Sequence, residues 1–344
     1  MPRIVTYGEI MARLETPGYQ RLQSLPGELN VTFAGAEASV AVSYSLLGGE
    51  SCFVTALPEH AVADACVRDL QSYGVQTQHI LRTGSGRLGL YFYEHGINHR
   101  PASVIYDRTG SAVSMTPSNG YDWETILAET DWFVVSGITP ALSSIAAEAT
   151  QDAVERAKQL GVRVACDMNY RSKLWRWEPE LSPRELARRT MSMIVPSVDL
   201  LLAGRDDLAE TLGVTDAASV EELSANAVSK FPNLQYLAMS VREDSPSVAQ
   251  RYGTFLYDVE SGSAFQSSQY EIGQVVDRLG TGDAMTAALL FGMTTAELSE
   301  PQKAIEFAAA AGCLAHSNPG DYHLSSRKEI EALVQGADGS RVQR

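Results

Sequence analysis

Short apolar runs alternate with segments of helical period along most of this 344-residue chain. The runs are rich in β-branched, aromatic and leucine residues and end near glycine, proline or a polar residue, which is typical of buried strands. Such alternation favours one α/β domain, with a mostly parallel sheet between two layers of helices. The sequence predicts strands at residues 3–7, 51–56, 132–136, 162–167, 200–203 and 236–240, and helices at residues 36–47, 62–73, 143–160, 183–194 and 220–231.

Two segments break this alternation, at about residues 10–35 and 86–114. Both are rich in glycine, aromatic residues and short alternating runs, and residues 88–93 and 102–106 read as antiparallel strands on either side of a turn. We expect these segments to form a small β-sheet that stands off the main sheet as a lid and could cover a ligand. The domain itself should span residues 1–335, and residues 336–344 should form a flexible tail.

The charge and the cysteine content narrow the class of protein. The chain carries 42 acidic and 27 basic residues, a formal net charge of −15, which repels a phosphate backbone and argues against a nucleic-acid partner. Its four cysteines are widely spaced, as expected for reduced thiols rather than a disulfide framework. The N-terminus lacks a signal-peptide pattern, and the longest near-apolar stretch is too short to cross a bilayer. We therefore expect a soluble, cytoplasmic protein with no membrane partner.

A glycine loop before an apolar helix is the sharpest local feature. Residues 277–283 read Asp-Arg-Leu-Gly-Thr-Gly-Asp, and an apolar helix follows. Glycines let backbone N–H groups converge, and the start of a helix adds partial positive charge, so the loop can cradle an anion. Asp283 beside that cradle could accept a proton from an attacking hydroxyl. The motif alone fits equally well with a tight turn in which Asp283 caps the helix.

The arrangement as a whole resembles the ribokinase-like, or PfkB, family of carbohydrate kinases. That family's C-terminal signature is commonly written Asp-x-x-Gly-Ala-Gly-Asp, which residues 277–283 match except at Thr281. The N-terminal element is similar too, with a strand ending in Gly8-Glu9 and a helix opening at residues 34–41. The resemblance implies a three-layer α/β/α fold, ATP and Mg²⁺ as cofactors, Asp283 as catalytic base, and Gly280, Thr281 and Gly282 as the anion cradle. It also implies ATP contacts from Ser240, Arg242, Gly280 and Gly282.

Within the family, the chain looks most like the 2-keto-3-deoxygluconate kinases. Residues 89–92 and 104–112 resemble that subfamily's substrate-facing lid, and residues 167–175 resemble its Asp-x-Asn-x-Arg-x-x-Leu-Trp segment. The resemblance implies phosphorylation of the terminal hydroxyl of a sugar acid, with 2-keto-3-deoxygluconate going to its 6-phosphate. The substrate contacts implied are Gly35, Ser39, Tyr91, Tyr106, Arg108, Asn169 and Arg171.

The two arginines in this set suit the proposed substrate on chemical grounds. A sugar acid carries a carboxylate, and a bidentate guanidinium is its natural partner. Arg108 and Arg171 are the candidates, against the alternatives of a solvated lid charge for Arg108 and a structural salt bridge for Arg171. Tyr91 and Tyr106 could pack on the sugar and donate a hydroxyl, or could simply pack within their strands.

Several positions depart from the family pattern. Ser39 replaces an Asn that often touches the sugar. The family's Asn-x-x-Glu element, linked to the network of metal-bound water, reads Gly-Arg-Asp-Asp at residues 204–207, where Asp207 could act on the metal through water while no side chain ligates it directly. The usual Lys/Arg-Gly loop on the nucleotide side is altered around Arg242. These changes leave the base and the cradle in place.

Two further functions stay open from the sequence. One is a fructokinase-like or other ketose kinase, because fructokinases share part of the 167–175 pattern. The other is a non-catalytic sugar- or nucleotide-binding protein on the same fold, which the altered loops at Gly204 and Arg242 would allow. An exposed lid strand could also pair with a second subunit, so we expect a homodimer or a higher homo-oligomer.

Overall fold

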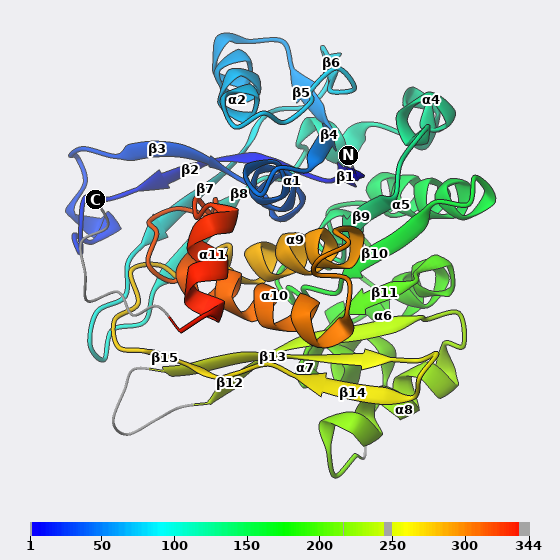
Figure 1. The fold of residues 1–344 in the computed structure, drawn as a ribbon. Coiled ribbons are helices and arrows are strands. Elements are labelled where there is room, and N and C mark those ends of the chain that lie inside the picture. Colours follow the sequence, from blue (N-terminus) through cyan, green and yellow to red (C-terminus); the bar gives the residue numbers. More distant parts are fainter. Residues whose placement is uncertain (1, 216, 244–249, 337–344) are drawn as a thin grey trace.

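The computed structural model describes residues 2–215, 217–243 and 250–336 (Figure 1). The expected tail lies outside these residues from position 337 onward. The strands are β1 (Arg3–Tyr7), β2 (Met11–Glu15), β3 (Asn30–Ala34), β4 (Glu50–Val54), β5 (Ala56–Pro58), β6 (Leu81–Thr83), β7 (Gly89–Glu94), β8 (Ser103–Asp107), β9 (Trp132–Ser136), β10 (Arg163–Asp167), β11 (Leu200–Leu202), β12 (Tyr236–Glu243), β13 (Gln250–Asp258), β14 (Ser263–Gln266) and β15 (Tyr270–Ile272).

The helices follow the predicted alternation. They are α1 (Ala36–Leu46), α2 (Ala61–Ser72), α3 (Ala112–Met115), α4 (Trp123–Leu127), α5 (Ser144–Gln159), α6 (Pro183–Ile194), α7 (Arg205–Asp207), α8 (Val220–Lys230), α9 (Thr281–Thr294), α10 (Pro301–Ala315) and α11 (Arg327–Val334). Local signals fix several of their starts. The hydroxyl of Ser182 and the carboxylate of Glu185 form a reciprocal capping box, and Pro183 occupies the first turn, so α6 begins where the sequence predicts.

The main sheet has the strand order β14-β13-β12-β11-β10-β9-β1-β4. Within this sheet, neighbouring strands run parallel from β4 through β1, β9, β10 and β11 to β12. Strand β13 pairs antiparallel with β12, β14 and β15. Sequence alternation predicted the parallel part, because each parallel neighbour needs a crossover helix. The antiparallel extension from β13 to β15 was not predicted.

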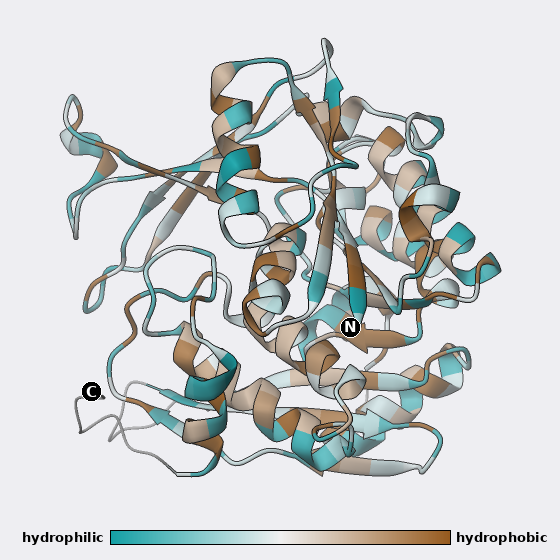
Figure 2. Cartoon of the chain, turned by 45° about the horizontal axis from the view of Figure 1, so that its top comes forward, coloured by the Kyte–Doolittle hydropathy of each residue, from teal (hydrophilic) through white to brown (hydrophobic). Residues whose placement is uncertain are grey.

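Two hydrophobic cores lie on opposite faces of the main sheet. Neighbouring residues of one strand enter different cores: Val5 and Phe133 pack with α5, α6 and α8, whereas Ile4 and Trp132 pack with α1, α9 and α10. This alternation follows from the pleat of a strand buried on both faces. Figure 2 shows the hydrophobic residues gathered on the central strands and on the helix faces that meet them. The chain therefore has the expected three-layer α/β/α architecture.

A second sheet, the small sheet, has the strand order β3-β2-β7-β8. Strand β2 runs antiparallel to β3 and parallel to β7, and β7 runs antiparallel to β8. It projects from the main body beside α1 (Figure 1). Its strands fall within the two segments that break the alternation, and the inner face of the sheet carries Met11, Arg13, Tyr91, Tyr93 and Tyr106.

Candidate active site

A pocket of about 760 Å³ lies between the small sheet and the carboxyl ends of the parallel strands. Residues that follow β1, β9, β10 and β11 line it, as expected for the ligand edge of an open α/β sheet. The inner face of the small sheet forms the opposite wall. The lining residues are Glu9, Met11, Gly35, Ala36, Glu37, Tyr91, Val104, Tyr106, Arg108, Ile138, Asp167, Asn169, Arg171, Gly204, Arg205, Asp206, Asp207, Ser240, Arg242, Arg278, Leu279, Gly280, Thr281, Gly282, Asp283 and Asp321.

The glycine loop enters this pocket at the start of α9. Gly280 precedes the helix in a left-handed conformation (φ 77°), and a Cβ there would lie 2.0 Å from the carbonyl oxygen of Asp321. Only glycine satisfies both conditions without strain. The first turn of α9 has backbone N–H groups without intrahelical acceptors, and the helix dipole adds positive character. The loop is therefore built to receive an anion.

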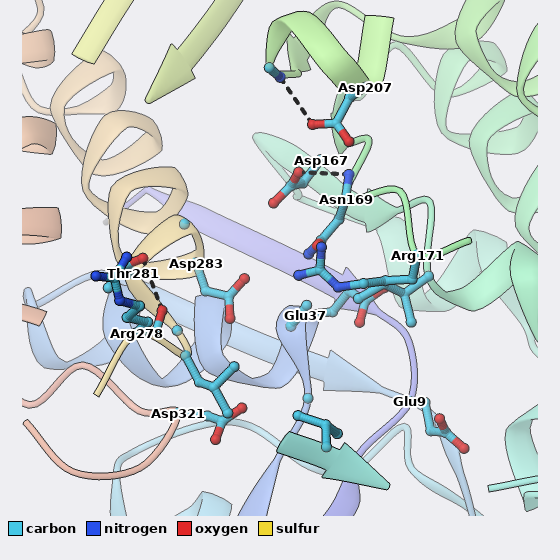
Figure 3. Close-up of a pocket in the computed structure, with 18 of the residues that line it drawn as sticks. Glu9, Glu37, Asp167, Asn169, Arg171, Asp207, Arg278, Thr281, Asp283 and Asp321 are labelled. Atoms are coloured by element: carbon cyan, nitrogen blue, oxygen red, sulfur yellow. Dashed lines mark hydrogen bonds between the residues drawn. The ribbon is translucent and has the colours of Figure 1, made fainter. Parts of the chain in front are cut away.

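Asp283 occupies the first turn of that helix and is buried, with 8% of its surface exposed. In Figure 3 its carboxylate points toward the space into which the guanidinium of Arg171 also reaches. Burial raises the pKa of Asp283 well above its usual value, and the negative charges of Asp167, Asp321 and Glu37 raise it further, while Arg171 opposes them. A carboxylate with a raised pKa holds a proton more strongly, which suits a general base.

Two further carboxylates lie at the ends of β10 and β11. Burial, followed by the charge of Asp207, raises the pKa of Asp167 to about 7. Oδ1 of Asp167 accepts the N–H of Asn169 at 3.1 Å, and Asn169 adopts a positive φ of 37°. Asp207 accepts the backbone N–H groups of Tyr170 and Gly204, both at 3.1 Å. These contacts fix the segment that carries Asn169 and Arg171 at the pocket.

The two arginines expected to bind a carboxylate have different surroundings. Arg108 is buried and forms an ion pair with Glu9, Nε donating to Oε2 at 2.6 Å. Its charge is therefore already compensated within the protein. Arg171 is exposed and enters no ion pair with any residue in the described part of the chain, and it lines the pocket opposite Asp283. Arg171 is the guanidinium still free to meet a ligand.

The far side of the glycine loop carries two more arginines. Nη2 of Arg242 donates to Oγ1 of Thr281 at 2.8 Å, and Arg278 lines the pocket one residue after Asp277. Neither forms an ion pair within the described ranges. Uncompensated guanidinium groups beside a helix N-terminus are suited to polyanionic phosphate. Ser240 lines the same side of the pocket.

The structure brings every site residue expected from the sequence into this pocket except Ser39. Ser39 lies on α1 with its side chain fully buried, and it is not among the residues that line the pocket. Sequence reasoning missed five acidic lining residues: Glu9, Glu37, Asp167, Asp206 and Asp321. Glu37 accepts hydrogen bonds from Ser136 and Thr139, and a Cβ at Gly8 would lie 2.1 Å from its carboxyl carbon. Glu9 and Glu37 sit inside the N-terminal motif and could have been tested as site candidates, whereas nothing local marks Asp321.

The acidic residues of the pocket bear on metal binding. In residues 2–215, 217–243 and 250–336 no group of three or more His, Cys, Asp or Glu side chains is arranged to hold a metal ion. Asp167 and Asp207 nevertheless place carboxylates at the strand ends, and hard oxygen ligands suit Mg²⁺. This donor set fits a hydrated Mg²⁺ that arrives with phosphate oxygens rather than one held by protein ligands alone.

The three-layer fold and this pocket together define an α/β enzyme that transfers a phosphoryl group. The chain belongs to the pfkB family of carbohydrate kinases, whose model matches residues 1–328. It is 30% identical to a 2-dehydro-3-deoxygalactonokinase from Haloferax volcanii, over 97% of each chain.

Solved structures agree with this assignment. A 2-dehydro-3-deoxygluconokinase from Thermotoga maritima superposes with a TM-score of 0.89 at 36% identity, covering 97% of this chain and 98% of that one. An Escherichia coli protein described as a ribokinase II, solved with ATP and Mg²⁺, shares the fold with a TM-score of 0.77 at 18% identity, covering 97% and 99% of the two chains. None of the helices in the described ranges has the length and apolar character needed to cross a membrane.

Proposed function

We propose that this carbohydrate kinase uses ATP to phosphorylate the terminal hydroxyl of a 2-keto-3-deoxy sugar acid. The observation that carries the proposal is the position of Asp283 and Arg171 on opposite sides of one pocket. A base at one end and a free guanidinium at the other suit a substrate with a hydroxyl at one end and a carboxylate at the other. The names of the Haloferax volcanii and Thermotoga maritima relatives support the same substrate class.

In the proposed reaction Asp283 removes the proton from the substrate hydroxyl as that oxygen attacks the γ-phosphorus of ATP. The bond from phosphorus to the β,γ-bridging oxygen breaks, and ADP leaves. The backbone N–H groups of Gly280, Thr281 and Gly282 face the negative charge that builds on the transferring group. Mg²⁺ bound with ATP would neutralise charge on the phosphate oxygens.

The remaining lining residues receive roles that follow from their contacts. Arg242 and Arg278 meet the ATP phosphates, because both lie beside the glycine loop and neither forms an ion pair with a residue that the structure describes. Tyr106 and Tyr91 form the sugar wall, with rings 6.1 Å apart on the small sheet. The small sheet acts as a lid that excludes water from the reacting atoms.

An ADP-release assay with ATP and Mg²⁺ tests the proposal directly. It compares 2-keto-3-deoxygluconate, 2-keto-3-deoxygalactonate, fructose and ribose at matched concentrations. We expect turnover of one or both keto-deoxy acids and little with the neutral sugars. Preferred turnover of fructose or ribose would keep the mechanism and refute the substrate class. The two acids differ at one stereocentre, and the assay decides between them.

The outer face of the small sheet supports a second subunit as a partner. Val31, Leu14, Phe92 and Ile105 are paired in register across the sheet and form one apolar row. Val31 and Ile105 are more than half exposed. We propose that a second copy of the chain covers this row, as the twofold symmetry of most dimers allows. Sedimentation of the wild type and of Ile105→Glu tests this: a monomer in both would refute it.

A further inference from the structure

Arg13 is a fully buried arginine that the mechanism above does not use. It lies on β2, a strand of the small sheet with neighbours on both sides, and its side chain has no exposed surface. Its guanidinium stands 4.4 Å from the ring of Tyr93. An unpaired buried charge would strongly destabilise the fold, so a buried arginine needs acidic partners. The segments that carry these partners are the ones that Arg13 holds together.

Three carboxylates surround the Arg13 guanidinium. Nε and Nη2 donate to Glu15 at 2.9 and 2.6 Å, Nη2 also donates to Asp277 at 2.6 Å, and Nη1 donates to Asp321 at 2.6 Å. Burial alone would lower the pKa of Arg13, but the negative charges of Asp321 and Asp277 outweigh it and raise the pKa. The planar fork therefore joins segments that lie 264 and 308 residues away along the chain.

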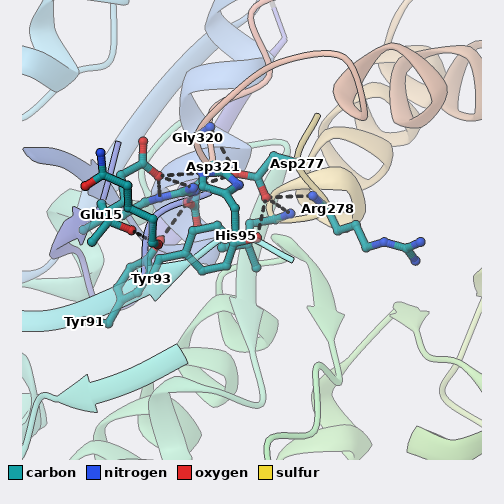
Figure 4. A network of polar contacts seen from close by, with 12 residues as sticks. Glu15, Tyr91, Tyr93, His95, Asp277, Arg278, Gly320 and Asp321 are labelled. Atoms are coloured by element: carbon teal, nitrogen blue, oxygen red, sulfur yellow. Dashed lines mark hydrogen bonds and ion pairs between the residues drawn. The ribbon is translucent and has the colours of Figure 1, made fainter. Parts of the chain in front are cut away.

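Asp277 links Arg13 to the glycine loop. Its Oδ1 accepts the backbone N–H of Arg278 at 2.7 Å and of Leu279 at 3.1 Å, so it shapes the turn that leads into Gly280. Its Oδ2 accepts Arg13 and, at 3.3 Å, the N–H of Gly320. Asp277 is fully buried and does not line the pocket, so its effect on the reaction must pass through the loop. Figure 4 shows this network.

Asp321 links Arg13 to Tyr91 in the sugar wall of the pocket. Its Oδ1 accepts both Arg13 and the hydroxyl of Tyr91, at 2.6 and 2.7 Å, and Tyr91 belongs to the wall of the pocket. The carbonyl of the same residue packs against Gly280. One guanidinium thus contacts the carboxylate that orders the phosphate loop and the carboxylate that orders the sugar wall.

We propose that Arg13 is a positioning residue for phosphoryl transfer, which holds the sugar wall of the small sheet and the glycine loop at the fixed separation that in-line attack requires. Its loss should lower the rate of transfer more than the binding of either substrate, because each half-site keeps its own contacts while their relative placement loosens. A displacement of about 1 Å between reacting groups can cost about 100-fold in rate.

The inference rests on the proposed function in one respect: phosphoryl transfer takes place at the 277–283 loop. The test therefore uses whichever sugar the wild type turns over fastest, so that a wrong choice of sugar acid leaves it intact. Arg13→Lys keeps the charge but loses the fork that reaches three carboxylates. Arg87→Lys is the matched control, because Arg87 lies just before β7 of the same small sheet and forms an exposed ion pair with Asp107, 2.6 Å apart.

For Arg13→Lys we expect kcat to fall by about tenfold or more, with the KM for sugar and ATP changed by less than about threefold. Arg87→Lys should match the wild type in both. Binding of ADP and of ADP–aluminium fluoride with sugar, measured by calorimetry, gives a readout independent of turnover: Arg13→Lys should weaken the second far more than the first. A wild-type kcat, or a loss confined to KM, would overturn the proposal.

A loss of activity caused by unfolding must be distinguished from one caused by misplaced reacting groups. Melting temperatures of both variants are measured beside the kinetics, and the comparison is made below the melting range. Should Arg13→Lys not fold, Asp277→Asn takes its place, because it keeps the size of the side chain and its acceptor for Arg278 while removing the charge that pairs with Arg13. An Asp277→Asn enzyme with wild-type kcat and wild-type affinity for ADP–aluminium fluoride would equally overturn the proposal.

Discussion

Nε of Arg108 donates to Oε2 of Glu9 at 2.6 Å, and the two side chains form a buried ion pair in the wall of the pocket. The pair joins the end of β8 to the end of β1. It removes Arg108 from the set of charges available to a ligand, although the sequence marked Arg108 and Arg171 as equal candidates. We therefore expect recognition of a substrate carboxylate to depend on Arg171.

Replacement of Arg171 by Ala should raise the KM for a sugar acid by roughly 10–100-fold, the range expected for losing a hydrogen bond to a charged group. The KM for a neutral ketose should change far less, because that substrate has no carboxylate to lose. Steady-state kinetics with both substrates check this, with Arg87→Ala as the control. Equal effects on the acid and the ketose would contradict the role of Arg171.

Replacement of Asp283 by Asn should leave a folded protein with turnover reduced by about 10²–10⁴-fold. The shape is kept, and the group that accepts the proton is lost. A coupled ADP-release assay measures the change, with circular dichroism to verify folding. Turnover within a few-fold of the wild type would rule out Asp283 as the base.

The same variant should be more stable than the wild type at neutral and alkaline pH. The raised pKa means that folded Asp283 binds its proton more tightly than unfolded Asp283, so wild-type stability falls as pH rises through and above the usual aspartate range. The amide in the Asp283→Asn variant carries no such charge, so we expect this variant to be more stable than the wild type at pH 8, by a margin that shrinks toward pH 4. Urea unfolding across this range measures it, and a constant difference would contradict the assignment.

The rate itself should fall on the acid side, because Asp283 accepts a proton only when ionised. Asp167, Asp321 and Glu37 face it with negative charge and Arg171 with positive charge, and burial adds to the net rise in its pKa. Removal of the Asp167 charge in Asp167→Asn should move the acid limb of kcat/KM to lower pH. A limb that stays in place would show that Asp167 does not set the proton affinity of the base.

Lys173 and Arg176 should assist capture of anionic substrates. Together with Arg108 they line a second cavity of about 440 Å³ that shares Val104 and Tyr106 with the main pocket. Neither has an ion pair within the described ranges, in a protein of net charge −15. The double variant Lys173→Gln/Arg176→Gln should lower kcat/KM for the sugar acid by about threefold or more at low salt.

The salt dependence discriminates this effect from local damage. The loss should shrink as ionic strength rises, since screening removes the advantage of the wild type. Arg68→Gln/Lys328→Gln is the matched control, because both residues are exposed and neither lines the pocket. A loss that persists at about 0.5 M salt, where screening is nearly complete, would indicate a direct contact instead.

The sequence was most informative where structure follows from local pattern. Strands β1 and β9 and helix α6 have the predicted bounds, because apolar runs, prolines and caps act within a few residues. The antiparallel extension β13–β15 was missed, since its strands carry mixed polar residues and no crossover helix separates them. The glycine loop was located from the sequence, because the spacing of its glycines and of Asp283 is what allows the loop to bind an anion beside a base.

Contacts between distant segments were beyond the sequence. Glu9 and Arg108 are 99 residues apart, and nothing near either one indicates the other. Ser39 lies on the same helix as Ala36 and Glu37, which line the pocket, but is itself fully buried and is not a lining residue, and no residue pattern indicates which of these positions meets the pocket. The small sheet was predicted as a unit, whereas its attachment through Arg13 was not.

The two faces of the small sheet also bear on how such enzymes diverge. Because successive side chains of a strand point to opposite faces, Tyr91 and Tyr106 meet the pocket while their neighbours Phe92 and Ile105 face outward. If the proposed sugar wall and the proposed subunit contact are correct, sugar preference and subunit association depend on alternate positions of the same strands. Substitutions on one face of the small sheet can therefore change one property while the other is kept. In the same way, the residues of one face can be redesigned without replacing those of the other.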